Sequence, residues 1–314
     1  MLVVRMIDAP QVVLLHQARI GRRDTVVLRH ASTVSHGVSQ RHSPKGREVK
    51  LLVTGGAGYL GSEVCRQAVE HGWDVVAAQL RNPPPFGRSQ RLDVRDAAAV
   101  DRVLMRHGPD VVVHTAYVLS GPELEQTVVR GSRAVAEAAR RCDARLVHLS
   151  TDLVFDGEQG APYDEEAEPR PVMDYGAAKL EAERLVAAAH PEALVVRTSL
   201  LYGKPEPGPQ ELLAFRDDVE FYTDEIRCPT IVSELATALL ELARLDVAGP
   251  LHVAAPEAVS RLELARILRA AHGLDPDAAR GAPSPGGARA RNVALDSSRA
   301  ARLLSRSLRG VRGE

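Results

Sequence analysis

Short apolar runs alternate with amphipathic stretches along the chain from Val49 onward. Apolar positions recur at helical spacing between these runs, and each run is nearly continuous in Val, Leu and Ile. Such alternation predicts a parallel sheet buried on both faces. We therefore expect an α/β fold, a Rossmann-type doubly wound parallel sheet, over residues 49–203. The expected strands are Leu51–Thr54, Asp74–Ala78, Val111–Thr115, Arg145–Ser150 and Leu194–Thr198, and the expected helices are Gly61–His71, Ala97–His107, Glu123–Cys142 and Tyr175–His190.

The alternation ends after Gly203, where Lys204–Pro209 is rich in Pro and Gly. Mixed short elements follow, which predicts a smaller C-terminal substrate lobe over residues 204–314 that partly returns to the Rossmann domain. The elements expected there are a strand at Val219–Tyr222, a helix at Ser233–Leu245, a strand at Leu251–Ala254, a helix at Arg261–His272 and a flexible loop at Gly281–Ala288.

Residues 1–48 follow no steady period of 2 or 3.6, and they carry eight basic and three acidic residues. An additional strand, a basic arm for an acidic partner and an Arg-rich targeting peptide are three alternatives. We interpret this segment as a poorly ordered extension, with the working chain beginning near Val49.

Composition excludes several classes of function. The chain has 314 residues, 45% of them hydrophobic, and a net charge of −1, so its overall charge does not indicate nucleic-acid binding. No apolar run approaches the ~18 residues of a membrane helix. Cys65, Cys142 and Cys228 are too far apart for a zinc motif or a disulfide framework. We expect a cytoplasmic protein without metal, membrane or nucleic-acid partners; a homodimer is a possible assembly.

The first chemical motif lies directly after the first predicted strand. Gly55, Gly58 and Gly61 have the spacing G-x-x-G-x-x-G, and a helical pattern follows. A strand, a tight turn and the free amides of a helix N-terminus together suit a pyrophosphate, which predicts a dinucleotide site. The simpler alternative is an ordinary strand-to-helix turn.

The residues after the second strand bear on the choice of cofactor. Gln79-Leu80-Arg81 contains no acid to accept a hydrogen bond from an adenosine ribose, and Arg81 could pair with a 2′-phosphate. We therefore expect NADP(H) to be preferred and NAD(H) to be possible, although Arg81 could equally be a solvated loop residue. Asp93 lies where a third strand would end, and its carboxylate could accept from the adenine amino group.

The strongest signal is the pair Tyr175 and Lys179, whose i, i+4 spacing puts both side chains on one helical face. A tyrosine near pKa 10 needs a neighbouring cation to act as an acid–base catalyst at neutral pH. Only four of the 40 basic residues are lysine, so a lysine here is informative. Thr151 follows a buried strand, where a hydroxyl could polarise a carbonyl. A surface aromatic beside a charge and a turn cap are the simpler alternatives.

In order, the segments TGGAGYLG, LDVRD, HTAY, STDLVFDG, YGAAK and RTSLLYG resemble the extended short-chain dehydrogenase/reductase family. Within that family, STDLVFDG, RTSLLYG and the Pro-Thr of Asp224–Thr230 are similar to the dTDP-4-dehydrorhamnose reductase branch. The resemblance implies a catalytic triad of Thr151, Tyr175 and Lys179, with Tyr175 donating a proton as hydride arrives and Lys179 lowering its pKa. It also implies that Asp152 faces the sugar. The cofactor would be lined by Gly55, Gly58, Tyr59, Leu60, Asp93, Val94, Thr115, Ala116 and Tyr117.

Three departures qualify the resemblance. Leu200 stands where that branch usually has a substrate-facing Trp, Arg130 where the wider family commonly has Asn, and Ala290 where the branch usually has Pro. In the related sugar-nucleotide dehydratases an Asp-Glu pair follows the threonine, whereas here Asp152 is followed by Leu153. Dehydration is therefore disfavoured. The implied function is an NAD(P)H-dependent reductase of a keto group on a nucleotide-linked sugar. The alternatives are an epimerase of such a sugar and a non-catalytic NADP-binding regulatory subunit.

Overall fold

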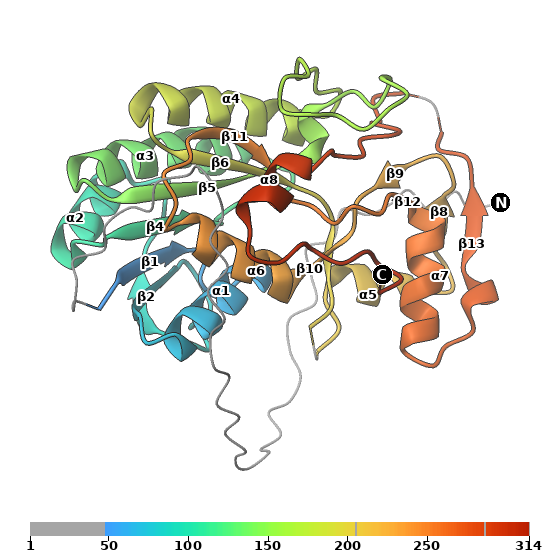
Figure 1. The fold of residues 1–314 in the computed structure, drawn as a ribbon, viewed down its shortest axis with the longest axis horizontal. Coiled ribbons are helices and arrows are strands. Elements are labelled where there is room, and N and C mark those ends of the chain that lie inside the picture. The colour runs from blue at the N-terminus through green and yellow to red at the C-terminus, as the bar shows by residue number, and fades with distance from the viewer. Residues whose placement is uncertain (1–47, 205, 286, 314) are drawn as a thin grey trace, which may run out of the picture.

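A seven-stranded parallel sheet forms the centre of the computed structural model, which describes residues 48–204, 206–285 and 287–313 (Figure 1). Its strand order is β11-β6-β5-β4-β1-β2-β3. Every pair of neighbouring strands in this sheet runs parallel; Val53 of the first strand, for example, lies opposite Ala77 on one side and Val113 on the other. The predicted Rossmann-type sheet is therefore confirmed. The strands are β1 (Lys50–Thr54), β2 (Asp74–Gln79), β3 (Arg88–Arg91), β4 (Val111–His114), β5 (Arg145–Thr151), β6 (Leu194–Thr198) and β11 (Gly249–His252).

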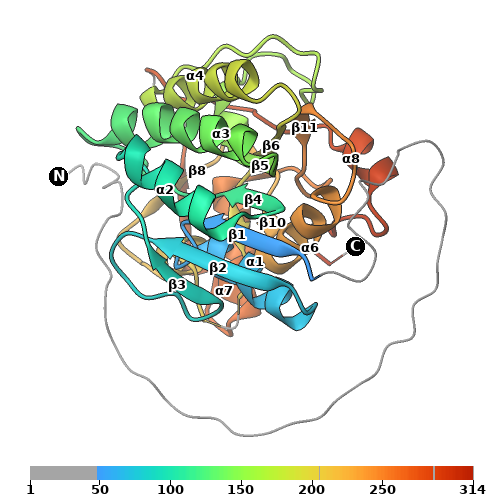
Figure 2. The same ribbon diagram turned by 90° about the vertical axis from the view of Figure 1, so that its left-hand side faces the viewer.

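Helices cover both faces of the sheet, as the continuous apolar strands require. One face packs against α2 (Ala97–His107), α3 (Gly131–Arg141) and α4 (Asp174–Ala189). The other packs against α1 (Tyr59–Glu70) and α6 (Val232–Leu242). Figure 2 shows the two helical layers on opposite sides of β1 and β2.

One predicted helix differs in form. The stretch expected as a single helix over Glu123–Cys142 consists of a π-helical segment, Glu125–Arg130, followed by α3. Directly after this wider turn, the start of α3 lies close to Val94: a Cβ at Gly131 would be only 2.9 Å from Val94 Cγ2. A π-helical turn often occurs at functional sites, and here it precedes the helix that packs behind Val94.

The part of the chain after residue 203 that lies at one end of the sheet forms the lobe, whereas α6 and β11 belong to the layers of the main sheet (Figure 1). The lobe consists of short two-stranded pairings and short helices. The pairs are β7 (Leu201–Tyr202) with β10 (Thr230–Ile231), β9 (Ile226–Arg227) with β12 (Val259–Ser260), and β8 (Glu220–Tyr222) with β13 (Arg280–Ala282); the helices are α5 (Pro209–Ala214) and α7 (Arg261–Ala271). Helix α8 (Ser298–Leu303) instead packs against β11 and the core of the main sheet.

Two predictions for the lobe need correction. The stretch Gly281–Ala288 is not simply a flexible loop, because β13 includes its first residues and Ser284 donates to the Asp224 carboxylate from its amide at 2.7 Å and its hydroxyl at 2.9 Å. The strand expected at Leu251–Ala254 begins two residues earlier, at Gly249, whose amide donates to Ala193 at 2.9 Å. It is the edge strand of the main sheet.

The prediction of a poorly ordered segment at residues 1–48 lies almost wholly outside the described residues. Within the part of the chain that is described, no helix is both long enough and apolar enough to cross a bilayer.

Candidate functional site

The glycine turn after β1 forms a narrow cradle at the start of α1. Gly55 has φ +70°, and a Cβ there would lie 2.9 Å from the Ala116 amide nitrogen. The Gly58 amide donates to the Gly55 carbonyl at 2.8 Å, and a Cβ at Gly61 would overlap that same oxygen. Only glycine allows this approach. The cradle and the amides that begin α1 at Tyr59 fit the pyrophosphate of a dinucleotide.

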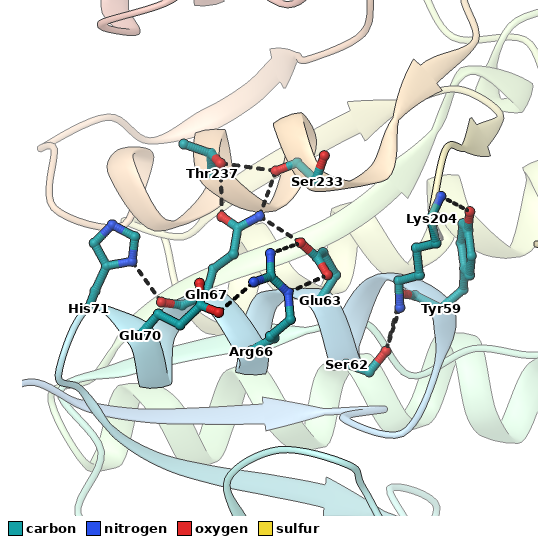
Figure 3. Close-up of polar contacts among 10 residues, drawn as sticks. All are labelled: Tyr59, Ser62, Glu63, Arg66, Gln67, Glu70, His71, Lys204, Ser233 and Thr237. Atoms are coloured by element: carbon teal, nitrogen blue, oxygen red, sulfur yellow. Dashed lines mark hydrogen bonds and ion pairs between the residues drawn. The ribbon is translucent and has the colours of Figure 1, made fainter. Parts of the chain in front are cut away.

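A lysine from the lobe reaches the first turn of α1 (Figure 3). Lys204 Nζ donates to Ser62 Oγ at 2.8 Å and lies 4.9 Å from the centre of the Tyr59 ring. The Lys204 amide donates to the Tyr59 hydroxyl at 3.2 Å. The loop after β7 is thus fixed beside the glycine turn. Sequence reasoning did not assign Lys204 to the site, although the rarity of lysine was a usable signal.

Buried polar side chains fix α1 to α6 (Figure 3). Gln67 Nε2 donates to the Ser233 carbonyl at 2.8 Å and to Glu63 Oε1 at 2.8 Å, and Thr237 donates to Gln67 Oε1 at 2.8 Å. Because the buried side chains of Gln67 and Glu63 are both paired, the contact stabilises the position of α1. The cradle at its N-terminus is therefore rigidly supported.

The residues expected to line the cofactor are only partly brought together. Thr115 donates from Oγ1 to the Thr54 carbonyl at 2.7 Å, and its neighbour Ala116 borders the glycine turn. Asp93 instead pairs with Arg95, whose Nη2 lies 2.7 Å from Asp93 Oδ2. These bonds lower the pKa of Asp93. Arg81 is exposed, outside the glycine cradle.

Tyr175 and Lys179 share one face of α4, as their spacing predicts. The helix approaches the end of β5 closely, because a Cβ at Gly176 would overlap the Leu153 carbonyl oxygen. The Tyr175 ring lies 6.1 Å from the ring of Tyr117, and Lys179 Nζ lies 5.9 and 5.8 Å from the centres of these two rings. The ammonium group is therefore about equally far from both tyrosine rings.

Burial dominates the electrostatics of this pair. Lys179 is 4% exposed and donates from Nζ to the Leu149 carbonyl at 2.8 Å. Burial lowers its pKa to about 8, with Glu183 acting in the opposite direction. Burial, reinforced by Tyr117 and Asp152, raises the pKa of Tyr175. The charge of Arg227 acts in the opposite direction and lowers it.

Thr151 and Asp152 lie at the C-terminal end of β5. Thr151 Oγ1 donates to Asp152 Oδ1 at 3.1 Å and accepts from the Leu153 amide at 3.2 Å. Asp152 is fully buried and accepts from Ser199 Oγ at 2.6 Å and from Arg227 Nε at 2.7 Å. The carboxylate expected to face a sugar is thus already occupied by side chains of the protein itself.

Leu200 follows Ser199 directly. It is partly buried and packs against the apolar core of the lobe, and its carbonyl accepts from the Thr230 amide at 2.7 Å.

Several residues near the site were not found from the sequence. They come from distant segments: Ser199 follows β6, Arg227 lies on the two-residue strand β9, and Arg261 begins α7. Burial, followed by the charge of Arg227, lowers the pKa of Arg261 to about 10. Strands this short leave no periodic signal, so their position could not be predicted from the sequence. The described residues contain no cluster of three or more His, Cys, Asp or Glu side chains that could hold a metal ion.

Comparisons with known proteins agree with this geometry. A family model described as the RmlD substrate binding domain matches residues 49–312. The dTDP-4-dehydrorhamnose reductase of Mycobacterium tuberculosis is 38% identical over 251 residues, which cover 75% of this chain and 79% of the relative. Methionine adenosyltransferase 2 subunit beta of Bos taurus is 31% identical over 273 residues, which cover 80% and 81% of the two chains.

Solved structures share the fold. The Bacillus anthracis dTDP-4-dehydrorhamnose reductase in complex with NADP matches with a TM-score of 0.74 and 24% identity, covering 85% of this chain and 96% of that one. Other structures of this fold were determined with NAD. The likeness confirms the predicted Rossmann-type architecture.

Proposed function

Because this chain belongs to the RmlD substrate-binding domain family, we propose that it is an NAD(P)H-dependent reductase of a keto group on a nucleotide-linked sugar. The single observation that carries the proposal is that Lys179 Nζ lies 5.9 Å from the centre of the Tyr175 ring and donates to the Leu149 carbonyl, on the strand that ends at Thr151. The relative at 38% identity is named for a reductase of this class.

The protonation state of Tyr175 suits reduction. Its phenol is protonated at neutral pH, because the ordinary tyrosine pKa of about 10 is raised further by burial, and it can donate to a carbonyl oxygen that becomes an alcohol. A bound nicotinamide would supply the hydride. Thr151 would hydrogen-bond the same oxygen, and Lys179, held by the Leu149 carbonyl, would stabilise the phenolate that remains.

We propose that the cofactor is held by the glycine turn and by the segment after β4. Gly55, Gly58 and Gly61 with the first amides of α1 would bind the pyrophosphate, and Thr115–Tyr117 would border it. Arg81 follows β2 without a neighbouring acid, which favours NADP(H) over NAD(H). Lys179 would also contact the nicotinamide ribose. We further propose that the enzyme is a cytoplasmic homodimer, which light scattering on the purified protein would test for the assembly.

The test is turnover by a Tyr175→Phe variant. A panel of nucleotide-linked keto sugars is supplied with NADPH or NADH, and absorbance at 340 nm is followed. Loss of the proton donor should lower kcat by at least about a hundredfold, while the cofactor dissociation constant stays within about twofold of wild type. Tyr202→Phe is a matched control, because this buried tyrosine on β7 lies in the lobe core. Equal turnover by the Tyr175 variant would contradict the assigned role.

A second candidate function follows from the relative named as a subunit of methionine adenosyltransferase 2. A regulatory subunit would bind NADP without turning over any sugar. The same panel separates the two, since such a protein would bind NADPH tightly and oxidise none of it, and Tyr175→Phe would change neither property.

A further inference from the structure

A buried ion pair joins the lobe to the end of the sheet. Asp152 is 0% exposed and Arg227, on β9, is 8% exposed. Arg227 Nε donates to Asp152 Oδ2 at 2.7 Å, and its Nη2 donates to Oδ1. A buried carboxylate requires a charged partner, because an isolated charge loses its hydration without compensation. The pair also joins two segments that are distant in sequence.

The same carboxylate holds two hydroxyl groups. Asp152 Oδ1 accepts from Thr151 Oγ1 at 3.1 Å, and Oδ2 accepts from Ser199 Oγ at 2.6 Å. Ser199 Oγ in turn accepts from the Cys228 amide at 3.2 Å, one residue beyond Arg227. These contacts connect the Thr151 hydroxyl, through the Asp152 carboxylate, to the neighbouring lobe residues Arg227 and Cys228.

We propose that Arg227 is a positioning residue, which acts by neutralising Asp152 and thereby fixing the Thr151 hydroxyl at the C-terminal end of β5. This inference rests on the proposed reductase function. Without Arg227, the buried carboxylate would lose the contact that orients it and compensates its charge, so the Thr151 hydroxyl would no longer be held in place to donate to a carbonyl oxygen.

The charges around Tyr175 support the same role. The groups that face it are Tyr117 after β4, Asp152 after β5, Lys179 on α4 and Arg227 on β9. Asp152 raises the pKa of Tyr175 and Arg227 lowers it, so the intact pair is more nearly balanced than either charge alone. Removing only Arg227 should therefore make Tyr175 a weaker proton donor as well.

A merely structural link between the lobe and the sheet makes different predictions, and a double-mutant cycle separates the two roles. The variants are R227Q, D152N, D152N/R227Q and the conservative R227K. The matched control is R269Q, because Arg269 is also a buried lobe arginine and donates to the Ala214 carbonyl at 3.0 Å and the Asp275 carbonyl at 2.7 Å. Its removal should reduce stability without changing kcat.

We expect R227Q to lower kcat by about a hundredfold with a smaller change in KM, and the double variant to regain at least about tenfold, because it removes the unpaired charge. R227K should be intermediate, since an ammonium cannot form the bidentate contact.

If R227Q does not fold, the double variant is compared with D152N and should be at least as active. A double variant no better than R227Q, or less active than D152N, would overturn the proposal, as would wild-type kcat in R227Q.

A second measurement uses the ligand-free protein and needs no turnover. Hydrogen exchange of a peptide covering residues 150–155 reports the Leu153 amide, which donates to Thr151 Oγ1 at 3.2 Å. Exchange should be faster in R227Q and slower again in the double variant, and unchanged exchange in R227Q would contradict the inference. A wild-type protein that reduces no sugar in the panel would instead disprove the proposed function, leaving the exchange result to decide the role of Arg227.

Discussion

The glycine turn after β1 is held by a backbone hydrogen bond within one short segment. The contact between the sheet and the lobe is instead held by the side chains of Asp152 and Arg227, which are 75 residues apart. In the turn, the Gly58 amide donates to the Gly55 carbonyl at 2.8 Å and the helix follows at once. At the lobe, three side chains from three segments share one buried carboxylate. The first arrangement depends on local shape, and the second depends on charge brought together by the fold.

This difference determines how the glycine turn and the Asp152–Arg227 cluster respond to substitution. A cradle made by close backbone contact is disrupted by any added atom, regardless of its charge. A buried ionic cluster tolerates isosteric changes in shape but is disrupted when one charge remains without its partner. The two regions should therefore fail in distinguishable ways.

The largest effect is expected at Gly61. A Cβ there would overlap the Gly55 carbonyl oxygen and lie 2.8 Å from Thr115 Oγ1. Gly61→Ala should lower the free energy of unfolding by about 3 kcal/mol and abolish measurable cofactor binding. Thermal denaturation and NADPH titration by fluorescence measure the two quantities.

Gly58→Ala is the matched comparison for that variant. Gly58 has φ −76°, which alanine adopts easily, and its Cβ would lie 3.1 Å from the Gly55 carbonyl oxygen. Stability should fall by less than about 1 kcal/mol, while cofactor affinity falls at least about tenfold if the pyrophosphate approaches this backbone. Full affinity in this variant would show that the turn does not form the cofactor site.

How much could be predicted from the sequence follows the same division. The sheet, the glycine turn and the Tyr175–Lys179 face depend on spacing within one segment, so periodicity and motif spacing predict them. The partners of Asp152 could not be predicted, because β9 has two residues and its position depends on pairing with β12. The raised pKa of Tyr175 also required the fold, since burial is its largest cause.

A smaller effect is expected at the buried carboxylate behind Lys179. Glu183, one turn further along α4, accepts from Arg197 Nη2 at 2.8 Å and from Ser150 Oγ. It also raises the pKa of Lys179, which burial lowers to about 8. Since the ammonium is lost as pH rises through about 8, kcat/KM for the cofactor should decline above that pH. Glu183→Gln should move this decline to lower pH and reduce stability by about 3 kcal/mol.

The sign of the stability effect is fixed by the same pKa. The ordinary lysine pKa is about 10.4, so between about pH 8 and 10.4 the unfolded chain binds more protons at Lys179 than the folded one does. The contribution of Lys179 to stability therefore rises with pH over that window, and its full burial penalty is present below pH 8. Glu181→Gln is the control, because Glu181 is exposed on α4 and its loss should leave the decline in place. An unmoved decline in Glu183→Gln would contradict the coupling.

The smallest effect is expected at Arg81, where binding of the cofactor would depend on charge rather than on the shape of the glycine turn. Arg81 is exposed after β2, so an ionic contact with a 2′-phosphate would be worth about 1.4 kcal/mol, or about tenfold in affinity. Arg81→Ala should weaken NADPH binding by that factor and leave NADH binding within about twofold. Arg102→Ala, which removes an exposed arginine from α2, should change neither.

Because the effect is ionic, the NADPH preference of the wild type should also fall as salt is raised from 0.05 to 0.5 M, roughly a threefold shortening of the Debye length. Equal losses for both cofactors in Arg81→Ala would assign the residue to general binding and would remove the basis for an NADP(H) preference.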